Sequence, residues 1–311
     1  MAQLDEKKTL LANYDIGPAQ LLNRGMEAEV YMLGDERVLK LYAGTSARTN
    51  LQTLQHFYAA LDRQALTYAL PEILAVETQD AFTVVIERRL VGRPLSELVA
   101  ECKPARLTEL LPRYLLAVLE LGQLPMPAVL KRYKLFDAEG ISSTDQGDWH
   151  HFLGRYLTAT QRALAPYFAR DVEAYAAKVT QMQTILTTPY EGPYALIHGD
   201  FFPGNLLVDR QGKPTALIDF GLFTMVGDPL FDVATACAFF DMYDELRVDL
   251  RERLFVLACT HLGETIRPLL YRYLLLYSFL SANTYSAECT DGHYAWCVAN
   301  LNNAGYWALV V

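Results

Sequence analysis

The stretch that decides the fold is His198–Val208, HGDFFPGNLLV, which is followed by Ile218–Gly221, IDFG. It places an aspartate at position 200, an asparagine five positions later and a second aspartate fourteen positions after that. Short apolar runs typical of strands (ALI, NLLV and PTALI) bracket these polar residues. We therefore expect Asp200, Asn205 and Asp219 to lie close together, near the ends of short strands.

These residue types suit phosphoryl transfer. A nucleotide phosphate with Mg²⁺ needs hard oxygen ligands, and the Asn205 carbonyl and the Asp219 carboxylate supply them without too much negative charge. A separate carboxylate must accept the proton of the attacking hydroxyl, and Asp200 fits that role. Taken alone, HGD is an ordinary strand end and DFG an ordinary turn. Their combination at this spacing favours a catalytic site.

HGDFFPGNLLV, IDFG and the later GDPLFDVA (227–234) resemble the aminoglycoside phosphotransferase and choline kinase superfamily, over about residues 15–240. Gly199, where protein kinases usually carry an arginine, favours the small-molecule members. The resemblance implies a protein-kinase-like fold, ATP or GTP as donor, Mg²⁺, and a small hydroxylated acceptor, with a cationic one among the candidates. It also implies that Asp232 braces the catalytic loop by hydrogen bonds, whereas Asp228 is interpreted as a helix cap.

The order of elements predicts an α+β chain with two lobes. Strand-like runs from Ile16 to Tyr42, a helix over 46–66 and two further strands (EILAVET and FTVVIERRL) indicate a small antiparallel sheet carrying one helix. Gly34-Asp35-Glu36 is a tight hairpin signal. Beyond residue 90 apolar periodicity predicts long helices over 104–124, 149–168 and 171–187, a surface loop at Phe136–Asp148, and a helical C-terminal region. We expect a nucleotide-binding lobe over 1–90 and a helical catalytic and acceptor-binding lobe over 91–311.

In the first lobe, the resemblance implies a hairpin that covers the nucleotide phosphates and a lysine on the third strand. The hairpin position is occupied by NRGMEAEVYML (23–33), whose glycine is Gly25, and the lysine position by Lys40. The base of the nucleotide would be held at the hinge, Ile86–Val91, mainly through backbone groups. Glu87 and Arg89 are therefore candidate nucleotide contacts.

The predicted helix departs from the family pattern. In the family this helix offers a glutamate to the lysine, but residues 45–66 contain no glutamate. A glutamine on the helix could orient Lys40 through a hydrogen bond, or an acid elsewhere could replace the missing glutamate. The candidates are Gln52 and Gln55 on the helix, and Glu27, Glu29 and Glu72 outside it.

The bulk composition excludes some classes of function. The formal net charge of −9 and the absence of a basic stripe argue against a nucleic-acid partner. No run approaches the roughly 20 apolar residues of a membrane span. The five cysteines form no CxxC pair and no signal-peptide pattern is visible, so we expect a cytoplasmic protein. The sequence gives no indication of oligomeric state.

The acceptor site is less clear. The segment 271–307 is rich in aromatic residues and carries Glu288 and Asp291. These residues either cage an amine or stack on a sugar, or the aromatics are core residues with polar tips. His150, His151 and His293 show no metal-ligand spacing, and His198 is interpreted as a structural hydrogen-bonding residue of the catalytic loop. Two functions stay open: an active small-molecule kinase, and a nucleotide-binding pseudokinase.

Overall fold

The computed structural model describes residues 2–24, 28–44, 48–125, 148–220, 224–242 and 249–310. Strands β1 to β5 form one antiparallel sheet in the order β1-β2-β3-β5-β4. The predicted turn joins β2 to β3, and Gly34 takes a φ of +66° there, a conformation that costs glycine little. The bounds are β1 (Leu21–Arg24), β2 (Ala28–Leu33), β3 (Arg37–Ala43), β4 (Ile73–Gln79) and β5 (Phe82–Arg88).

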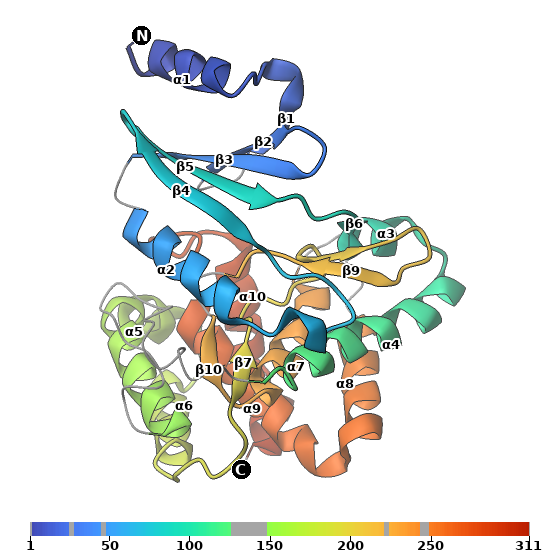
Figure 1. Ribbon diagram of the computed structural model, residues 1–311. Coiled ribbons are helices and arrows are strands. Elements are labelled where there is room, and N and C mark those ends of the chain that lie inside the picture. Colours follow the sequence, from blue (N-terminus) through green and yellow to red (C-terminus); the bar gives the residue numbers. More distant parts are fainter. Residues whose placement is uncertain are drawn as a thin grey trace.

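The two faces of this sheet pack against different partners. Strand alternation places Tyr31, Leu39 and Val84 on the outer face, where they form a small core with Leu10 of helix α1 (Ala2–Asn13). Val85 lies on the other face and belongs to the large core of the molecule. Figure 1 shows α1 above the sheet and α2 below it. The inner face, which also carries Lys40, is therefore the one turned toward the rest of the protein.

Helix α2 (Arg48–Ala60) is the helix predicted over 46–66, and it ends earlier than expected. A short 3₁₀ turn, Arg63–Ala65, follows it, because the Asp62 side chain accepts the N–H of Gln64 and caps that turn. Phe57 and Tyr58 of α2 are buried in the large core. The helix thus packs between the sheet and the large core.

The helical part of the chain is built around α9. Its residues from Tyr273 to Ser281 are all buried, and α5, α7, α10 and α11 pack against it. The helices are α3 (Leu95–Glu101), α4 (Pro104–Leu121), α5 (Trp149–Asp171), α6 (Tyr175–Ile185), α7 (Leu230–Ala238), α8 (Asp249–Leu262), α9 (Arg267–Ser281), α10 (Gly292–Asn302) and α11 (Ala304–Leu309).

Short strands lie between the sheet and these helices. They pair as β6-β8-β9 and as β10-β7, and an isolated bridge joins Ala69 to Ala216 of β9. Their bounds are β6 (Arg93–Pro94), β7 (Ala195–Ile197), β8 (Leu206–Val208), β9 (Pro214–Leu217) and β10 (Met225–Gly227). They support the polar loops that the sequence singled out.

The fold class is confirmed: a small antiparallel sheet with one inner helix precedes a larger helical part (Figure 1). Helix α3 and strands β6 and β10 were not predicted, because their periodic patterns are too short to detect. Of the predicted loop Phe136–Asp148, only Asp148 lies within the described residues, where it caps α5. Within the described ranges, no helix combines the length and apolar character needed to span a membrane.

Candidate active site

The three polar residues of the two motifs converge, as predicted. The loop from His198 to Asn205 joins β7 to β8, and Asp219 follows β9, which pairs with β8. The Asn205 side chain donates to Asp200 Oδ2 at 3.2 Å, and the backbone carbonyl of Asn205 accepts the N–H of Ile218 at 2.9 Å. Asp200 and Asn205 are therefore in direct contact. Asp219 directly follows Ile218, whose N–H is bonded to Asn205.

The orientation of the Asn205 amide suits a metal ligand. Its Nδ2 donates to both the backbone carbonyl of Asp200, at 2.9 Å, and the Asp200 carboxylate. With the nitrogen committed to Asp200, Oδ1 of Asn205 is the atom left to accept. One amide oxygen and the Asp219 carboxylate form a hard oxygen donor set of the kind that Mg²⁺ prefers.

The pKa of Asp200 is raised by its surroundings. Burial raises its pKa to about 6, the hydrogen bond from Asn205 opposes that shift, and the negative charge of Asp219 adds to it. A base is most effective when its pKa lies near the working pH. Asp200 is therefore mostly ionised at neutral pH and more basic than an ordinary aspartate.

His198 holds the loop of residues 198–205 against the segment that follows β9 and carries Asp219. Its Nδ1 accepts the backbone N–H of Asp200 at 3.2 Å, and its Nε2 lies 2.9 Å from the carbonyl of Ile218. This pattern requires the neutral ring with its proton on Nε2. Burial lowers the pKa of His198 to about 4, in keeping with that form. His198 is a structural hydrogen-bonding residue, as the sequence predicted.

Asp232, on α7, braces the same loop from below. Its Oδ2 accepts the N–H of His198 at 2.6 Å and its Oδ1 accepts the N–H of Gly199 at 2.8 Å. Gly199 has a φ of +79°, which lets two consecutive amides point at one carboxylate. Asp228 accepts the N–H of Leu230 at the start of α7, which confirms its interpretation as a cap.

The residues around Asp219 hold an uncommon backbone conformation. Asp219 has a φ of +58°, a left-handed conformation that non-glycine residues rarely adopt and that clusters at functional sites. The ring of Phe220 packs on His198, with centroids 4.3 Å apart, and on Phe57 and Tyr58 of α2. Packing by His198 and by helix α2 thus fixes the backbone that presents the Asp219 carboxylate.

Lys40 forms an ion pair that the sequence analysis did not predict. Its Nζ lies 3.1 Å from Glu87 Oε2, and Glu87 comes from β5. Burial lowers the pKa of Lys40, but the charges of Glu87 and Asp219 outweigh that effect and raise it above its ordinary value. Lys40 is therefore a charged lysine that is paired with Glu87 and lies near Asp219.

The proposed partners of Lys40 are corrected by this finding. Gln55 donates to the carbonyl of Ile73, Glu29 pairs with Lys7 and Arg24, and Glu72 pairs with Arg63 and Arg88. No contact between Gln52 and Lys40 is found within the described residues, and Glu27 lies outside them. The register of β3 against β5 determines the real partner, and that register is not visible in the local sequence.

The nucleotide contacts predicted at the hinge and hairpin have different outcomes. The N–H of Arg89 donates to the carbonyl of Glu36 and its guanidinium to that of Asp35, so both groups are used by the β2–β3 turn. The backbone N–H of Arg89 is therefore not available to a nucleotide. Strands β1 and β2 pair as the predicted hairpin, but Gly25, which lies between them in the sequence, is outside the described residues.

Comparison with known proteins agrees with this geometry. A sequence profile described as the phosphotransferase enzyme family matches residues 18–269. The chain belongs to the phosphotransferase enzyme family. No curated protein matched it closely enough to be informative.

Solved structures of similar fold cover nearly the whole phosphotransferase. APH(2″)-IIa in complex with gentamicin is 16% identical, with a TM-score of 0.65 and coverage of 98% of this chain and 97% of that one. ADP-bound APH(2″)-Ib is 15% identical, with a TM-score of 0.62 and 99% coverage of both chains. The GDP complex of aminoglycoside 2′-phosphotransferase-IIIa is 15% identical, with a TM-score of 0.64 and coverage of 97% and 99%. At these identities the likeness shows the fold.

The aromatic residues near the C-terminus of the phosphotransferase are mostly core. Tyr273, Tyr277 and Tyr294 are at most 6% exposed, so the interpretation as core residues with polar tips holds for them. Asp291 caps α10 by accepting the N–H of Tyr294. The half-buried Trp296 donates to Asp241 at 2.8 Å.

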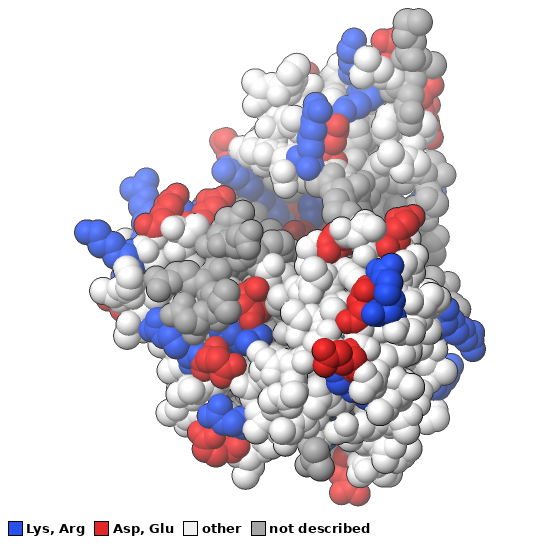
Figure 2. Space-filling view, turned by 180° about the vertical axis from the view of Figure 1, so that it is seen from behind, with Lys and Arg blue, Asp and Glu red and all other residues white. Residues whose placement is uncertain are grey.

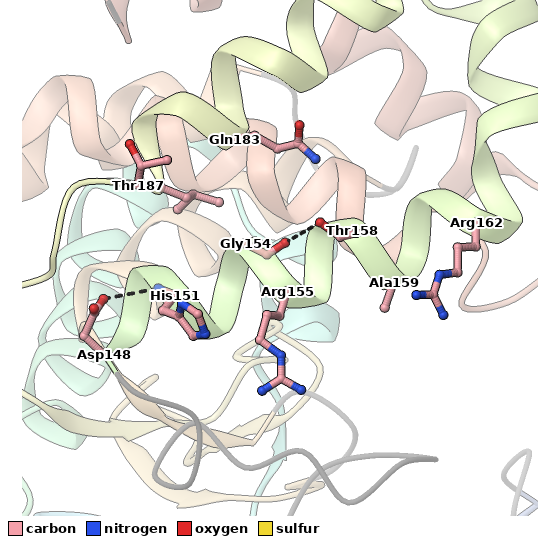
Figure 3. Close-up of a pocket in the computed structure, with 10 residues that line it drawn as sticks. Asp148, His151, Gly154, Arg155, Thr158, Ala159, Arg162, Gln183 and Thr187 are labelled. Atoms are coloured by element: carbon pink, nitrogen blue, oxygen red, sulfur yellow. Dashed lines mark hydrogen bonds between the residues drawn. The ribbon is translucent and has the colours of Figure 1, made fainter.

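An open cavity of the phosphotransferase, about 660 Å³ in volume, lies between α5 and α6 (Figure 3). Its lining includes Asp148, which caps α5, His151, Arg155 and Arg162 of α5, and Gln183 of α6. Lys40, Asp200, Asn205 and Asp219 do not line it. The cavity is therefore separate from the candidate active site.

Charged residues of both signs are interspersed on the described face of the phosphotransferase drawn in Figure 2. Lys and Arg alternate there with Asp and Glu, and no broad basic area is visible. This arrangement fits the net charge of −9.

Proposed function

We propose that this phosphotransferase moves the γ-phosphoryl group of a nucleoside triphosphate, ATP or GTP, to a hydroxyl group of a small molecule. The convergence of Asp200, Asn205 and Asp219 with the charged Lys40 carries the proposal. A base, two oxygen ligands for a metal and a cation for the phosphates are the parts that phosphoryl transfer needs.

Each residue has a role in one step. The acceptor oxygen attacks the γ-phosphorus, the bond between that phosphorus and the β–γ bridging oxygen breaks, and the acceptor proton passes to Asp200. Asn205 Oδ1 and the Asp219 carboxylate would hold Mg²⁺, which neutralises charge on the phosphates. Lys40 binds the phosphates of the donor and keeps them in line with Asp200.

The nucleotide would lie between the two proposed lobes, 1–90 and 91–311. The hairpin of β1 and β2, with Gly25 at its tip, would cover the phosphates. Because the N–H of Arg89 and the carbonyl of Val91 are already bonded, the peptide groups around Leu90 are the ones that would hold the base. Similar folds bind ADP and GDP in solved complexes, which supports a nucleotide of either base.

We propose an acceptor of the aminoglycoside type or another small hydroxylated metabolite. The gentamicin complex of a protein with the same fold supports the first. The pseudokinase alternative rested mainly on the missing helix glutamate. Glu87 provides a carboxylate for Lys40, which weakens this argument for a pseudokinase.

Phosphate NMR of Mg²⁺–ATP and Mg²⁺–GTP with a panel of aminoglycosides, amino alcohols and sugars tests the proposal. We expect a new phosphomonoester signal with at least one acceptor, and its loss in Asp200→Asn. The pseudokinase alternative would instead be supported if the wild-type protein binds nucleotide but neither phosphorylates an acceptor nor hydrolyses the nucleotide. A signal that survives in Asp200→Asn would refute the assignment of the base.

A further inference from the structure

The ion pair of Lys40 is built within one sheet. Lys40 is opposite Val85, and Glu87 is opposite Val38, so Glu87 lies diagonally across from Lys40. Directly opposed and alternate residues of an antiparallel pair share one face, and a diagonal separation of ~7–8 Å is within reach of long side chains. The measured Nζ–Oε2 distance of 3.1 Å follows from this register.

The pair is sheltered from solvent. The Glu87 side chain is 9% exposed and the Lys40 side chain 23% exposed. Ion pairs on an open surface contribute little, because water screens them and the side chains move. A buried carboxylate, by contrast, restricts the lysine to one position, since the alternative is an unpaired buried charge.

Helix α2 contributes a neutral group at the place where an acid is expected. Its residues from Arg48 to Ala60 include no acid. The Tyr58 ring packs edge-on against Phe220, with ring centroids 5.6 Å apart, and its hydroxyl lies near enough to Glu87 and Asp219 to be affected by their charges. Burial and these neighbouring acids raise the pKa of Tyr58 well above its usual value, so the hydroxyl is uncharged. Helix α2 thus packs against Phe220, the residue next to Asp219, and brings no charge to Lys40.

We propose that Glu87 of β5 is the residue that positions Lys40 for the nucleotide phosphates, in place of a helix glutamate. This inference rests on the proposed function. A helix-to-strand ion pair depends on how the helix packs, and kinases control activity through that packing. A pair between two hydrogen-bonded strands is set by their register, so Lys40 is in place whenever the sheet is folded.

A double-mutant cycle of Lys40→Met and Glu87→Gln tests this inference. Both substitutions keep the approximate size of the side chain and remove its charge. The readouts are the affinity for Mg²⁺ with a non-hydrolysable nucleotide, measured by calorimetry, and the separate kcat and KM values of the transfer reaction. Thermal unfolding checks that each variant is folded.

We expect Glu87→Gln alone to weaken nucleotide affinity and turnover by roughly tenfold to a hundredfold. In the Lys40→Met background the same change should have an effect of less than about twofold, because Glu87 then has no lysine to position. The double variant leaves neither charge unpaired, so it stays measurable even where Glu87→Gln is unstable. Glu72→Gln is the matched control: it removes an ion pair with Arg63 and Arg88 on the same lobe and should leave nucleotide affinity unchanged.

Two results would overturn this inference and leave the proposed function intact. One is an unchanged nucleotide affinity in Glu87→Gln. The other is an equal loss of affinity from Glu87→Gln in the presence and in the absence of Lys40. The second would show that Glu87 supports the sheet and not the lysine. If the wild-type protein binds no Mg²⁺–nucleotide, the proposed function fails first, and the positioning role fails with it.

Discussion

Asp232 accepts the backbone N–H of Gly199 through Oδ1, and through Oδ2 it accepts that of His198. One carboxylate therefore satisfies two consecutive buried amides of the catalytic loop. In Asp232→Ala both amides lose their acceptor, and each unsatisfied buried donor costs about 1–3 kcal/mol. We expect the free energy of unfolding to fall by roughly 2–5 kcal/mol and activity to fall with it, as measured by urea unfolding.

Asp209→Ala is the matched control for that experiment. Asp209 also accepts two backbone amides, those of Gln211 and Lys213, but in an exposed turn. Water can replace the carboxylate there, so the loss should stay below about 1 kcal/mol. Equal losses for the two variants would show that burial of the catalytic loop is not what makes Asp232 important.

Asp200→Asn separates chemistry from binding. The substitution removes the proton acceptor but keeps the size of the side chain and its place beside Asn205. Loss of a general base typically costs ~10²–10⁴-fold in rate. We expect kcat to fall by that amount while the affinity for Mg²⁺–nucleotide changes by less than about twofold, as measured by calorimetry. Near-normal turnover would mean that another group takes the proton.

Asp219 is expected to affect the metal directly. Asp219→Ala removes the proposed carboxylate ligand, so the gain in nucleotide affinity that Mg²⁺ provides should disappear. Asp219→Asn keeps one oxygen and tolerates the φ of +58° better than alanine, so it should retain part of that gain. Titrations with Mg²⁺ and with EDTA measure the difference. If Mg²⁺ strengthens nucleotide binding equally in all three proteins, Asp219 is not a ligand.

Sequence reasoning predicted the centre of the candidate site but not the contacts that support it. Asp200, Asn205 and Asp219 were found because they lie within two short motifs, where spacing along the chain determines position in space. The partner of Lys40 was missed because Glu87 lies 47 positions further along the chain and reaches Lys40 only through the register of β3 and β5. Asp232 was reached through the family resemblance, since no local pattern connects α7 to the loop that it holds. Tyr58 looked like an ordinary apolar position of α2.

His198 predicts a pH-dependent stability. Its pKa is about 4 in the folded protein against an ordinary value of 6.5, because burial disfavours the charged ring. Between those two pH values the unfolded chain binds the proton and the folded chain does not. Stability is therefore complete above pH 6.5 and is lost as the pH falls toward 4, by about 2 kcal/mol already at pH 5.

Comparison of wild type with His198→Gln at pH 7.5 and pH 5 isolates this effect. The pKa values of Asp200 and Asp232 are raised by burial to about 6 and about 7, so these groups titrate in the same range, but they do so in both proteins. We expect the stability advantage of wild type over the variant to shrink by about 2 kcal/mol at pH 5 in urea unfolding. A difference that does not change with pH would mean that the folded imidazole titrates normally.

Gly92 directly precedes β6, and both its backbone conformation and the close packing around it disfavour a side chain at this position. Its φ is +148°, and a Cβ atom there would lie 2.5 Å from Thr215 Oγ1 and 2.8 Å from Leu207 Cβ. The Thr215 hydroxyl cannot easily move away, because it donates to the carbonyl of Val91 at 2.7 Å. Gly92→Ala should therefore lower the free energy of unfolding by about 2–4 kcal/mol, through backbone strain and overpacking together. It should also weaken nucleotide binding, since the hinge would have to shift.

Gly34→Ala is the control: its φ is +66° but no atom lies within 4 Å of the added methyl, so only the strain of about 1–2 kcal/mol is expected. Thermal unfolding and nucleotide calorimetry on both variants decide the matter. If Gly92→Ala is no less stable than Gly34→Ala, the backbone near Gly92 can move to accommodate the added methyl group. Close packing against β8 and β9 would then not fix its position.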